Sequence, residues 1–312
     1  MEPVTNEGRT TWHCLEMLVC PLCHARLTDC IHGLRCTACD LTYTFTEGIP
    51  RMIDESWLDE ATRQEMAAQD EHFAGLPDKA VFKPDHHSRY RRRRMRQHLK
   101  HLLAELDNGI ADRPSVHVAC CGTGYEVEAL QAAGWIVSAS DLSAQALYGL
   151  RKRSAIRGHR VPYLQADVRH LPFAADSFDA VVVVEGLHHT PDPLGGFAEL
   201  VRIARHQVAV IEPYTTSALN LMAWVGLAHR AEYSQDQPCR LTASLVGQML
   251  SIAGVESGTA RLYLDLPPGR PTDTVGDWPI LSALLSNCNA AAEWLLRRMG
   301  LGNKILLVVN VK

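Results

Sequence analysis

The sequence of 312 residues lacks any apolar run that approaches the roughly 18 residues needed to cross a bilayer. Its first residues, Met1 to Glu7, have neither the basic start nor the apolar core of a signal peptide. Internal repeats and low-complexity tracts are also missing. These absences favour a cytoplasmic protein.

The chain also lacks a strong excess of charge, since 31 Lys and Arg stand against 35 Asp and Glu. The net charge of −4 therefore offers no whole-chain argument for nucleic-acid binding, although local charge can still matter. Ten cysteines are too few for a disulfide scaffold in a chain of this length. Length and composition predict one large core with a small accessory module.

Four of the cysteines form two Cys-x-x-Cys pairs, Cys20 with Cys23 and Cys36 with Cys39. Each pair can point two thiolates at one centre, and two such knuckles complete a tetrahedral zinc site. Four thiolates leave no open coordination position, so the zinc would be structural and the module would depend on it for folding. The alternatives are reduced free cysteines or a redox pair, but two matched pairs argue for one shared metal.

The segment from Cys20 to the exit Gly48-Ile49-Pro50, with Tyr43 between, resembles the zinc ribbon fused ahead of many class I methyltransferases. It also resembles the ribbon at the front of bacterial rRNA guanine methyltransferases. We therefore expect a zinc-ribbon module over residues 1–54.

A helical linker or cap is expected over residues 55–110, with a break at Gly75-Leu76-Pro77. Met95 to Leu106 carries one apolar stripe at helical spacing, and an arginine-rich run, residues 89–96, begins that helix. The arginines form either a solvated helix face or a phosphate-contacting patch for RNA or an anionic acceptor.

From residue 111 onward, strands alternate with helices. Strands are expected at 116–119, 135–141, 161–167, 176–185 and 207–213, with helices at 125–133, 143–153 and 194–204. This alternation predicts an α/β fold with a doubly wound, Rossmann-like parallel sheet, whose ligand loops lie at the carboxyl edge. A further helix is expected at 241–253, with strands at 261–266 and 304–311.

The first of these strands ends at a glycine turn, Cys121-Gly122-Thr123-Gly124, where the backbone can approach a cofactor with no Cβ in the way. Asp141 closes the second strand, 17 positions after Gly124. An acid at about this interval binds ribose hydroxyls in dinucleotide folds.

Six motifs in order resemble the class I S-adenosylmethionine (SAM) dependent methyltransferases, in their small-molecule "type 11" branch. The motifs are Cys121–Gly124, Ser140–Ser143, Gln165–Val168, Leu171–Phe173, Asp176–Asp179 and Leu187–His189. The resemblance covers roughly residues 115–213 and implies a SAM-dependent methyltransferase domain over 111–312. It also implies that the strand at 304–311 enters the sheet antiparallel at its edge.

The resemblance implies a set of cofactor-binding residues. They are Ala119, Cys121, Gly122, Gly124, Asp141, Leu142, Asp167, Val168 and Glu185. Within it, the two glycines line the methionine part of SAM, Asp141 holds the ribose and Asp167 binds the adenine amino group. Helix N-capping after a strand is the alternative for both aspartates.

His188 and His189 lie in the loop that faces the acceptor in this family. Either imidazole could accept the acceptor's proton, because the ordinary pKa of histidine lies near neutrality. The alternative is that they pack against the cofactor.

The glycine turn departs from the family pattern at two positions. Val118 stands where an Asp or Glu usually receives the amino group of SAM, and Cys120 stands where the first glycine usually lies. Loss of that acid removes a contact worth about 1.5–3 kcal/mol unless another group, such as Glu126 or Glu185, replaces it.

Beyond the fifth strand, residues 219–228 form an apolar helical segment too short to span a membrane. We interpret it as part of a lid over the acceptor pocket, at about 214–255, or as a homodimer face. Residues 277–299 are also expected to be helical.

Three functions compete. The first is methylation of a small, biosynthetic acceptor, polar or apolar, at O, N or C. It is favoured because Glu185-Gly186-Leu187-His188 stands where a base methyltransferase often has an Asn/Asp-Pro-Pro-Tyr motif. The second is methylation of rRNA or tRNA gripped by the ribbon and the arginine-rich helix. The third, motivated by the departures in the glycine turn, is a SAM-fold protein with other chemistry or none.

Overall fold

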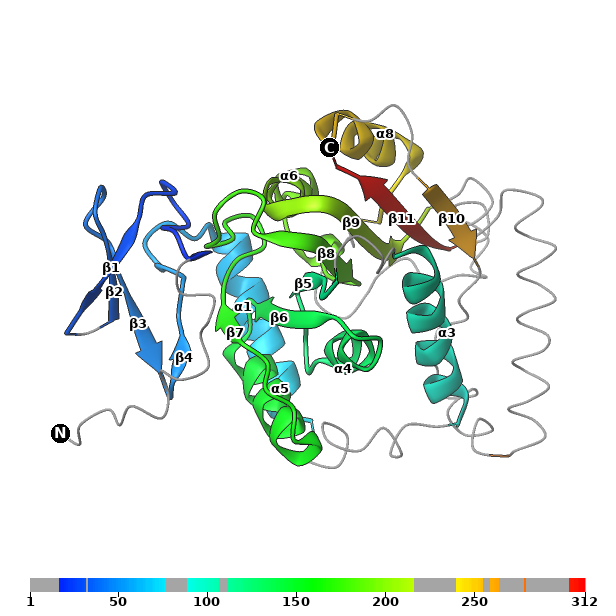
Figure 1. Cartoon of the computed structure of the whole chain (residues 1–312), viewed down its shortest axis with the longest axis horizontal. Coiled ribbons are helices and arrows are strands. Elements are labelled where there is room, and N and C mark those ends of the chain that lie inside the picture. Colours follow the sequence, from blue (N-terminus) through cyan, green and yellow to red (C-terminus); the bar gives the residue numbers. More distant parts are fainter. Residues whose placement is uncertain are drawn as a thin grey trace.

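The computed structural model describes residues 17–31, 33–76, 89–106, 112–215, 240–254, 259–263, 278 and 303–311 (Figure 1). The predicted lid helix at 219–228 lies outside the described residues, as does the predicted helix at 277–299 apart from Trp278. None of the helices within these ranges is long and apolar enough to cross a membrane.

The described N-terminal part is a small antiparallel sheet of four strands in sequential order. The strands are β1 (Leu27–Cys30), β2 (Gly33–Cys36), β3 (Thr42–Thr46) and β4 (Ile49–Pro50). The two Cys-x-x-Cys knuckles flank β1 and β2, as the ribbon interpretation predicts.

The larger sheet has seven strands in the order β10-β11-β9-β8-β5-β6-β7. Its strands are β5 (Ser115–Ala119), β6 (Ile136–Asp141), β7 (Tyr163–Gln165), β8 (Phe178–Val184), β9 (Ala204–Pro213), β10 (Thr259–Tyr263) and β11 (Lys304–Asn310). The five strands from β5 to β9 pair in parallel, whereas β11 runs antiparallel to β9 and β10 antiparallel to β11. The predicted doubly wound α/β fold and the antiparallel direction of the last strand are confirmed. The predicted edge position of that strand is wrong, because β10 pairs with the outer side of β11 and forms the edge itself.

Helices cover both faces of this sheet, which explains the continuous apolar run of β8. They are α3 (Arg89–Glu105), α4 (Tyr125–Ala132), α5 (Ala144–Arg157), α6 (Pro193–Ile203) and α8 (Ala243–Ile252). Val181 and Val183 of β8 pack into the core that includes α6 and α8. Ala180 and Val182 face the core that includes α3, α4 and α5.

The small sheet docks on the edge strand β7. The backbone N–H of Met52 donates to the carbonyl of Gln165 in β7 at 2.8 Å, and Val19 N–H donates to the Pro172 carbonyl at 3.0 Å. Apolar side chains of the ribbon, Tyr43 among them, belong to the same buried cluster as Phe173 of the larger domain. The ribbon and the seven-stranded sheet therefore share one core.

Within the described residues 55–76 and 89–106, two helices lie between the ribbon and the large sheet in the sequence. Helix α1 (Glu60–Ala74) packs along α5, and its N-cap Asp59 accepts a hydrogen bond from Thr62 N–H. Leu102 of α3 and Leu106, just beyond its end, are buried members of the predicted apolar stripe, while Arg93 and Arg96 of α3 are exposed. Figure 1 shows α3 on the opposite side of the large sheet from the ribbon.

Candidate functional site

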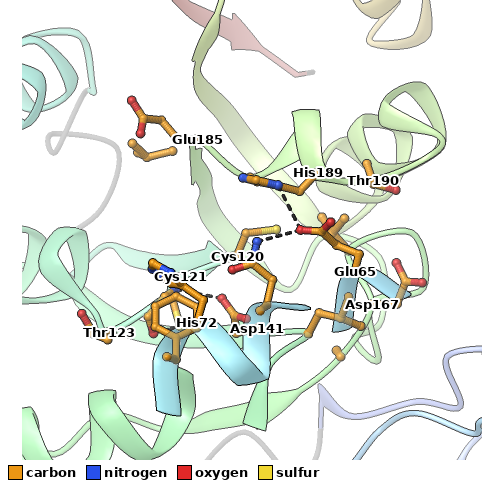
Figure 2. Close-up of a pocket in the computed structure, with 18 of the residues that line it drawn as sticks. Glu65, His72, Cys120, Cys121, Thr123, Asp141, Asp167, Glu185, His189 and Thr190 are labelled. Carbon is orange, nitrogen blue, oxygen red and sulfur yellow. Dashed lines mark hydrogen bonds and ion pairs between the residues drawn. The ribbon is translucent and has the colours of Figure 1, made fainter. Parts of the chain in front are cut away.

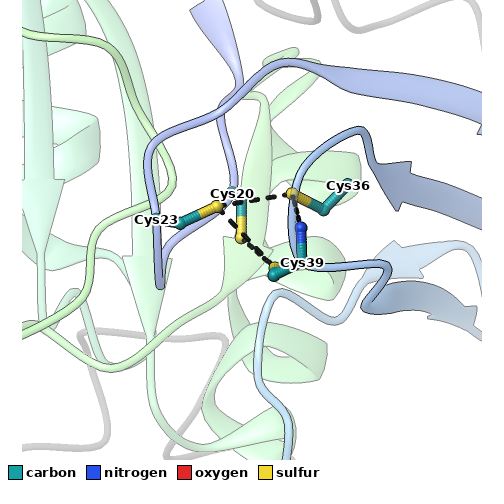
Figure 3. Close-up of side chains that lie close together, drawn as sticks. All are labelled: Cys20, Cys23, Cys36 and Cys39. Atoms are coloured by element: carbon teal, nitrogen blue, oxygen red, sulfur yellow. Dashed lines mark hydrogen bonds between the residues drawn. The ribbon is translucent and has the colours of Figure 1, made fainter.

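The four predicted metal ligands converge at one point of the ribbon. The Sγ atoms of Cys20, Cys23, Cys36 and Cys39 lie within 4.8 Å of one another (Figure 3). Three of the Sγ–Sγ separations are 3.4, 3.6 and 3.7 Å. These separations suit a tetrahedral Zn–S₄ centre, whose edges are about 3.8 Å for Zn–S bonds of 2.3 Å. The donor set therefore fits zinc.

Backbone and side-chain groups around the cysteines support the same conclusion. The N–H groups of Ala38 and Cys39 point at Cys36 Sγ at 3.4 Å, which stabilises a thiolate. The Tyr43 hydroxyl lies 3.1 Å from Cys20 Sγ and is buried. Outer contacts of this kind orient metal ligands.

The glycine turn follows β5 and opens on a cavity. Gly122 and Gly124 have φ values of 50° and 85°, in the left-handed region that favours glycine. A Cβ on Gly124 would lie 2.3 Å from Leu150 Cδ1, so glycine is needed there for the packing of α4 against α5. At Gly122 a Cβ would face the ring of Phe73 at 3.6 Å, across the cavity.

The cavity has a volume of about 290 Å³ and lies at the carboxyl ends of the central strands, beneath α1 (Figure 2). Eight of the predicted site residues line it. They are Cys121, Gly122, Asp141, Leu142, Asp167, Val168, Glu185 and His189. Ala119, Gly124 and His188 are not among the lining residues. Ala119 is fully buried below the turn, and Gly124 shapes the turn from behind.

Five carboxylates line this cavity, and no lysine or arginine is found among the described lining residues. The acidic residues are Glu65, Glu126, Asp141, Asp167 and Glu185. Asp167 and Glu185 are ion-paired with Arg169 and Lys304, so Glu126 and Asp141 are the acids that favour a ligand with positive charge and hydroxyl donors.

Asp141 closes β6 and faces the cavity. Its two oxygens accept the N–H groups of Gly122 and Ser143, each at 2.8 Å. Ser143, and not Asp141, is the N-cap of α5, so capping does not account for this acid. Burial raises the pKa of Asp141 to about 6. Each oxygen keeps a second acceptor position, which suits a pair of ribose hydroxyls.

Asp167 is held by Arg169. Its Oδ2 accepts from Arg169 Nη2 at 2.7 Å, and only 3% of the residue is exposed. Arg169 also donates to Asp59 at 2.6 Å and to Thr62 at 2.5 Å, so it connects Asp167 to the start of α1.

Val118 points away from the cavity. It is 1% exposed and belongs to the core on the α4 side of the sheet. Glu126, in the first turn of α4, lies at the cavity wall instead. Burial, with a contribution from nearby Glu185, raises the pKa of Glu126 to about 7. A ligand cation beside Glu126 would lower this pKa again and favour the charged carboxylate. This behaviour is expected of an acid that binds an ammonium group.

The two histidines have different surroundings. His188 is 3% exposed, and its Nδ1 lies 2.6 Å from Glu212 Oε2. Glu212 also accepts the N–H groups of Gly186 and Leu187, so this pair fixes the loop after β8. His189 lines the cavity, and its Nδ1 lies 3.0 Å from Glu65 Oε1 (Figure 2).

Sequence reasoning missed the contribution of α1. Glu65, Gln69, His72 and Phe73 of this helix all line the cavity. The sequence predicted a helical segment here, but a polar helix carries no signal for the partner that it covers.

Comparison with known proteins supports a methyltransferase domain in the central part of the chain. The family described as "Methyltransferase domain" matches residues 117–211. A demethylmenaquinone methyltransferase from Clavibacter sepedonicus is 42% identical over 84 residues, which is 27% of this chain and 34% of that protein. The chain thus matches about a third of the length of this curated relative.

Two solved structures have a similar fold. One is a chain of the complex between the Haloferax volcanii Trm112 methyltransferase activator and a putative methyltransferase; it has a TM-score of 0.51 at 19% identity and covers 80% of this chain and 96% of that chain. The other is magnesium protoporphyrin IX methyltransferase (ChlM) from Synechocystis PCC 6803 with bound SAH, with a TM-score of 0.50 at 13% identity, covering 83% of this chain and 100% of that chain. At these identities the likeness concerns the fold.

Proposed function

We propose that this chain, whose residues 117–211 are a class I SAM-dependent methyltransferase domain, methylates a small molecule at O, N or C and releases S-adenosylhomocysteine. The observation that carries the proposal is the acidic cavity at the glycine turn, where Gly122 allows close approach and Asp141 presents its carboxylate. The name of the curated relative, which refers to a small-molecule substrate, supports the acceptor class.

When bound, SAM supplies an electrophilic methyl group on a sulfonium. The protein therefore has to bind SAM and the acceptor, orient them, and remove a proton from the acceptor. Asp141 would accept hydrogen bonds from the ribose hydroxyls of SAM. Asp167, which is fixed by Arg169, would lie at the adenine end of the cofactor. Glu126 would receive the amino group in place of the acid that Val118 replaces, and Glu185, which is ion-paired with Lys304, would lie next to it.

His189 is the proposed general base, because it lines the cavity whereas His188 is buried against Glu212. His188 then orders the loop and does not touch the acceptor. The predicted division into a ribbon (1–54), a helical cap (55–110) and a catalytic domain (111–312) remains our proposal, as does the lid or dimer role of 219–228.

We also propose that the four cysteines hold one structural zinc ion. All four ligand positions would be occupied by thiolates, so the ion would stabilise the ribbon and take no part in the reaction.

Methylation of RNA is the second candidate, because the exposed Arg93 and Arg96 form a basic surface on α3. The ribbon and α3 lie on opposite sides of the large sheet, so the two do not form one continuous RNA-binding surface (Figure 1). A gel shift with bulk tRNA and rRNA at two salt concentrations tests this candidate. A steep salt slope would favour RNA, and the absence of binding at low salt would eliminate it.

Calorimetry with SAM and S-adenosylhomocysteine tests the main proposal, followed by incubation of the full chain with methyl-labelled SAM and a cell metabolite extract. We expect binding, a labelled small molecule and S-adenosylhomocysteine in equal amounts. Asp141→Asn should weaken binding by about tenfold, and Asp40→Asn, on the exposed surface of the ribbon, should leave it unchanged. Binding without any S-adenosylhomocysteine in the turnover mixture would refute methyl transfer.

A further inference from the structure

Glu65 is a buried acid on a helix that precedes the methyltransferase domain in the sequence. It is 5% exposed, yet it lines the cofactor cavity. Its Oε1 lies 3.0 Å from Nδ1 of His189, which comes from the loop after β8 (Figure 2). An acid in this position would be costly to bury without a function or a partner.

The contact determines which nitrogen of His189 carries the proton. A carboxylate can only accept, so Nδ1 of the imidazole must donate to Glu65 Oε1. In the neutral ring the lone pair then resides on Nε2. The nitrogen that can accept a proton is therefore the one that Glu65 does not occupy.

Glu65 is itself held in place. Gln69, one turn later on α1, donates from Nε2 to Glu65 Oε1 at 2.6 Å. Helix α1 is attached to the domain on both sides of Glu65. Arg169 binds Asp59 at its start, and Asp70 accepts from Ser143 Oγ at 2.5 Å near its end. The position of the carboxylate is thus set by the whole helix and not by one flexible side chain.

The neighbouring histidine provides a second support. The rings of His188 and His189 lie 4.1 Å apart, and His188 is fixed by Glu212. His189 is therefore held by Glu65 through its Nδ1 and by the ring of His188 through its face. A base whose orientation is fixed before the acceptor arrives loses little entropy in the reaction.

We propose that Glu65 of α1 is a positioning residue for His189, which it holds as the Nδ1–H tautomer so that Nε2 takes the proton of an acceptor that enters the cavity protonated. This inference rests on the proposed function. The acceptor's X–H bond breaks and its proton passes to Nε2. The electron pair on X forms the new X–CH₃ bond while the S–CH₃ bond breaks and leaves its pair on sulfur. Glu65 balances the charge of the imidazolium that results.

The tautomer can be measured in the full chain without knowledge of the acceptor. Protein labelled with ¹⁵N-histidine is examined by long-range ¹H–¹⁵N correlation at about pH 8, where most imidazoles are neutral. The His189 signals are assigned by their loss in His189→Asn. The variants are Glu65→Leu and, as a milder change that keeps an acceptor oxygen, Glu65→Gln. Glu71→Gln removes a carboxylate from the exposed face of the same helix and serves as the control.

We expect His189 to carry its proton on Nδ1 in the unmodified protein, with and without S-adenosylhomocysteine. Glu65→Leu should shift the tautomer ratio by on the order of tenfold toward Nε2–H, because a hydrogen bond to a charged group is lost. Glu65→Gln should shift it less, and Glu71→Gln should not shift it at all.

A proton on Nε2 in the unmodified protein would overturn the inference, as would an unchanged ratio in Glu65→Leu. If Glu65→Leu does not fold, an unchanged ratio in Glu65→Gln together with an unchanged ratio in Gln69→Leu overturns it instead. Failure of the proposed function would appear differently, as a lack of S-adenosylhomocysteine binding by the unmodified protein.

Discussion

Cys120 occupies a backbone conformation that residues with a Cβ rarely adopt, with a φ of 51°. It stands where the family usually has glycine, and its side chain fills space beside Gly186. A Cβ on Gly186 would lie 2.4 Å from Cys120 Cβ and 2.9 Å from its Sγ. The side chain at 120 is therefore accommodated because position 186 has none.

This complementarity makes a prediction for stability. Gly186→Ala should lower the free energy of unfolding by about 1–3 kcal/mol through overpacking. In a Cys120→Gly background, Gly186→Ala should lower the free energy of unfolding by a smaller amount. Some overpacking remains, because the Val183 side chain also lies close to position 186. Urea denaturation of the four proteins of this double-mutant cycle should give a coupling energy above about 0.5 kcal/mol. Additive effects would contradict the interpretation.

Two of the cavity acids, Glu126 and Asp141, predict that ligand affinity depends on pH. Because the pKa of Glu126 is raised to about 7 and that of Asp141 to about 6, both lose charge as the pH falls below these values. S-adenosylhomocysteine carries an ammonium group, so its affinity should rise between about pH 5.5 and 7.5, by at most about tenfold per pH unit for each acid. The sign for stability is the opposite. A raised folded-state pKa favours folding at low pH, and this contribution is lost as the pH rises through 6 to 7.

Calorimetry across this range provides the measurement. Glu126→Gln should weaken binding at about pH 7.5 and flatten the upper part of the profile, and the exposed Glu71→Gln should do neither. A profile that Glu126→Gln leaves unaltered would assign the amino group to another acid.

At the scale of elements, α1 forms one wall of the cavity at the carboxyl edge of the sheet. It contributes lining residues, and it is tied to the domain through Arg169, which contacts Asp59, Thr62 and Asp167. Helix α1 and Asp167 are thus held by one guanidinium, whose geometry allows several simultaneous hydrogen bonds.

Arg169→Met should therefore weaken both the attachment of α1 and the support of Asp167. The buried Asp167 would lose its partner, and we expect the free energy of unfolding to fall by about 3–5 kcal/mol. Affinity for S-adenosylhomocysteine should fall because the start of α1 loses one of its attachments to the domain. Thermal denaturation and calorimetry check the two effects, with the exposed Arg160→Met as control. Unchanged affinity in a folded Arg169→Met protein would show that α1 is seated by other contacts.

At the scale of the molecule, the ribbon is an integral part of the core. Leu18, Tyr43 and Met52 are buried in one cluster with Leu171 and Phe173, next to the Asp167–Arg169 segment of the cavity wall. Loss of the metal should consequently disturb the cofactor site as well as the ribbon.

Metal analysis should find one zinc per chain, and removal by a strong chelator should lower both the melting temperature and the affinity for S-adenosylhomocysteine. Cys36→Ser should reproduce these losses. Cys30→Ser, a nearby cysteine outside the cluster, should not. Full zinc content and stability in Cys36→Ser would refute the site.

Local patterns in the sequence were sufficient for much of this protein. The spacing of four cysteines predicted a converging cluster, because a Cys-x-x-Cys turn constrains its two thiolates locally. Alternating apolar strands and helices predicted the parallel sheet, and the acid that closes β6 was placed at the cavity because strand ends share one edge. Each of these features depends on a few neighbouring residues.

Only the tertiary structure separated His188 from His189, since adjacent residues in a loop can face a core or a cavity according to what packs on them. It also brought Glu65 to His189 across more than a hundred positions of chain and showed that Val118 is a core residue while Glu126 faces the cavity. Such pairings arise from how helix α1 lies over the sheet. The glycine turn and Asp141 were thus determined by local sequence, whereas the partner of the proposed base was decided by packing.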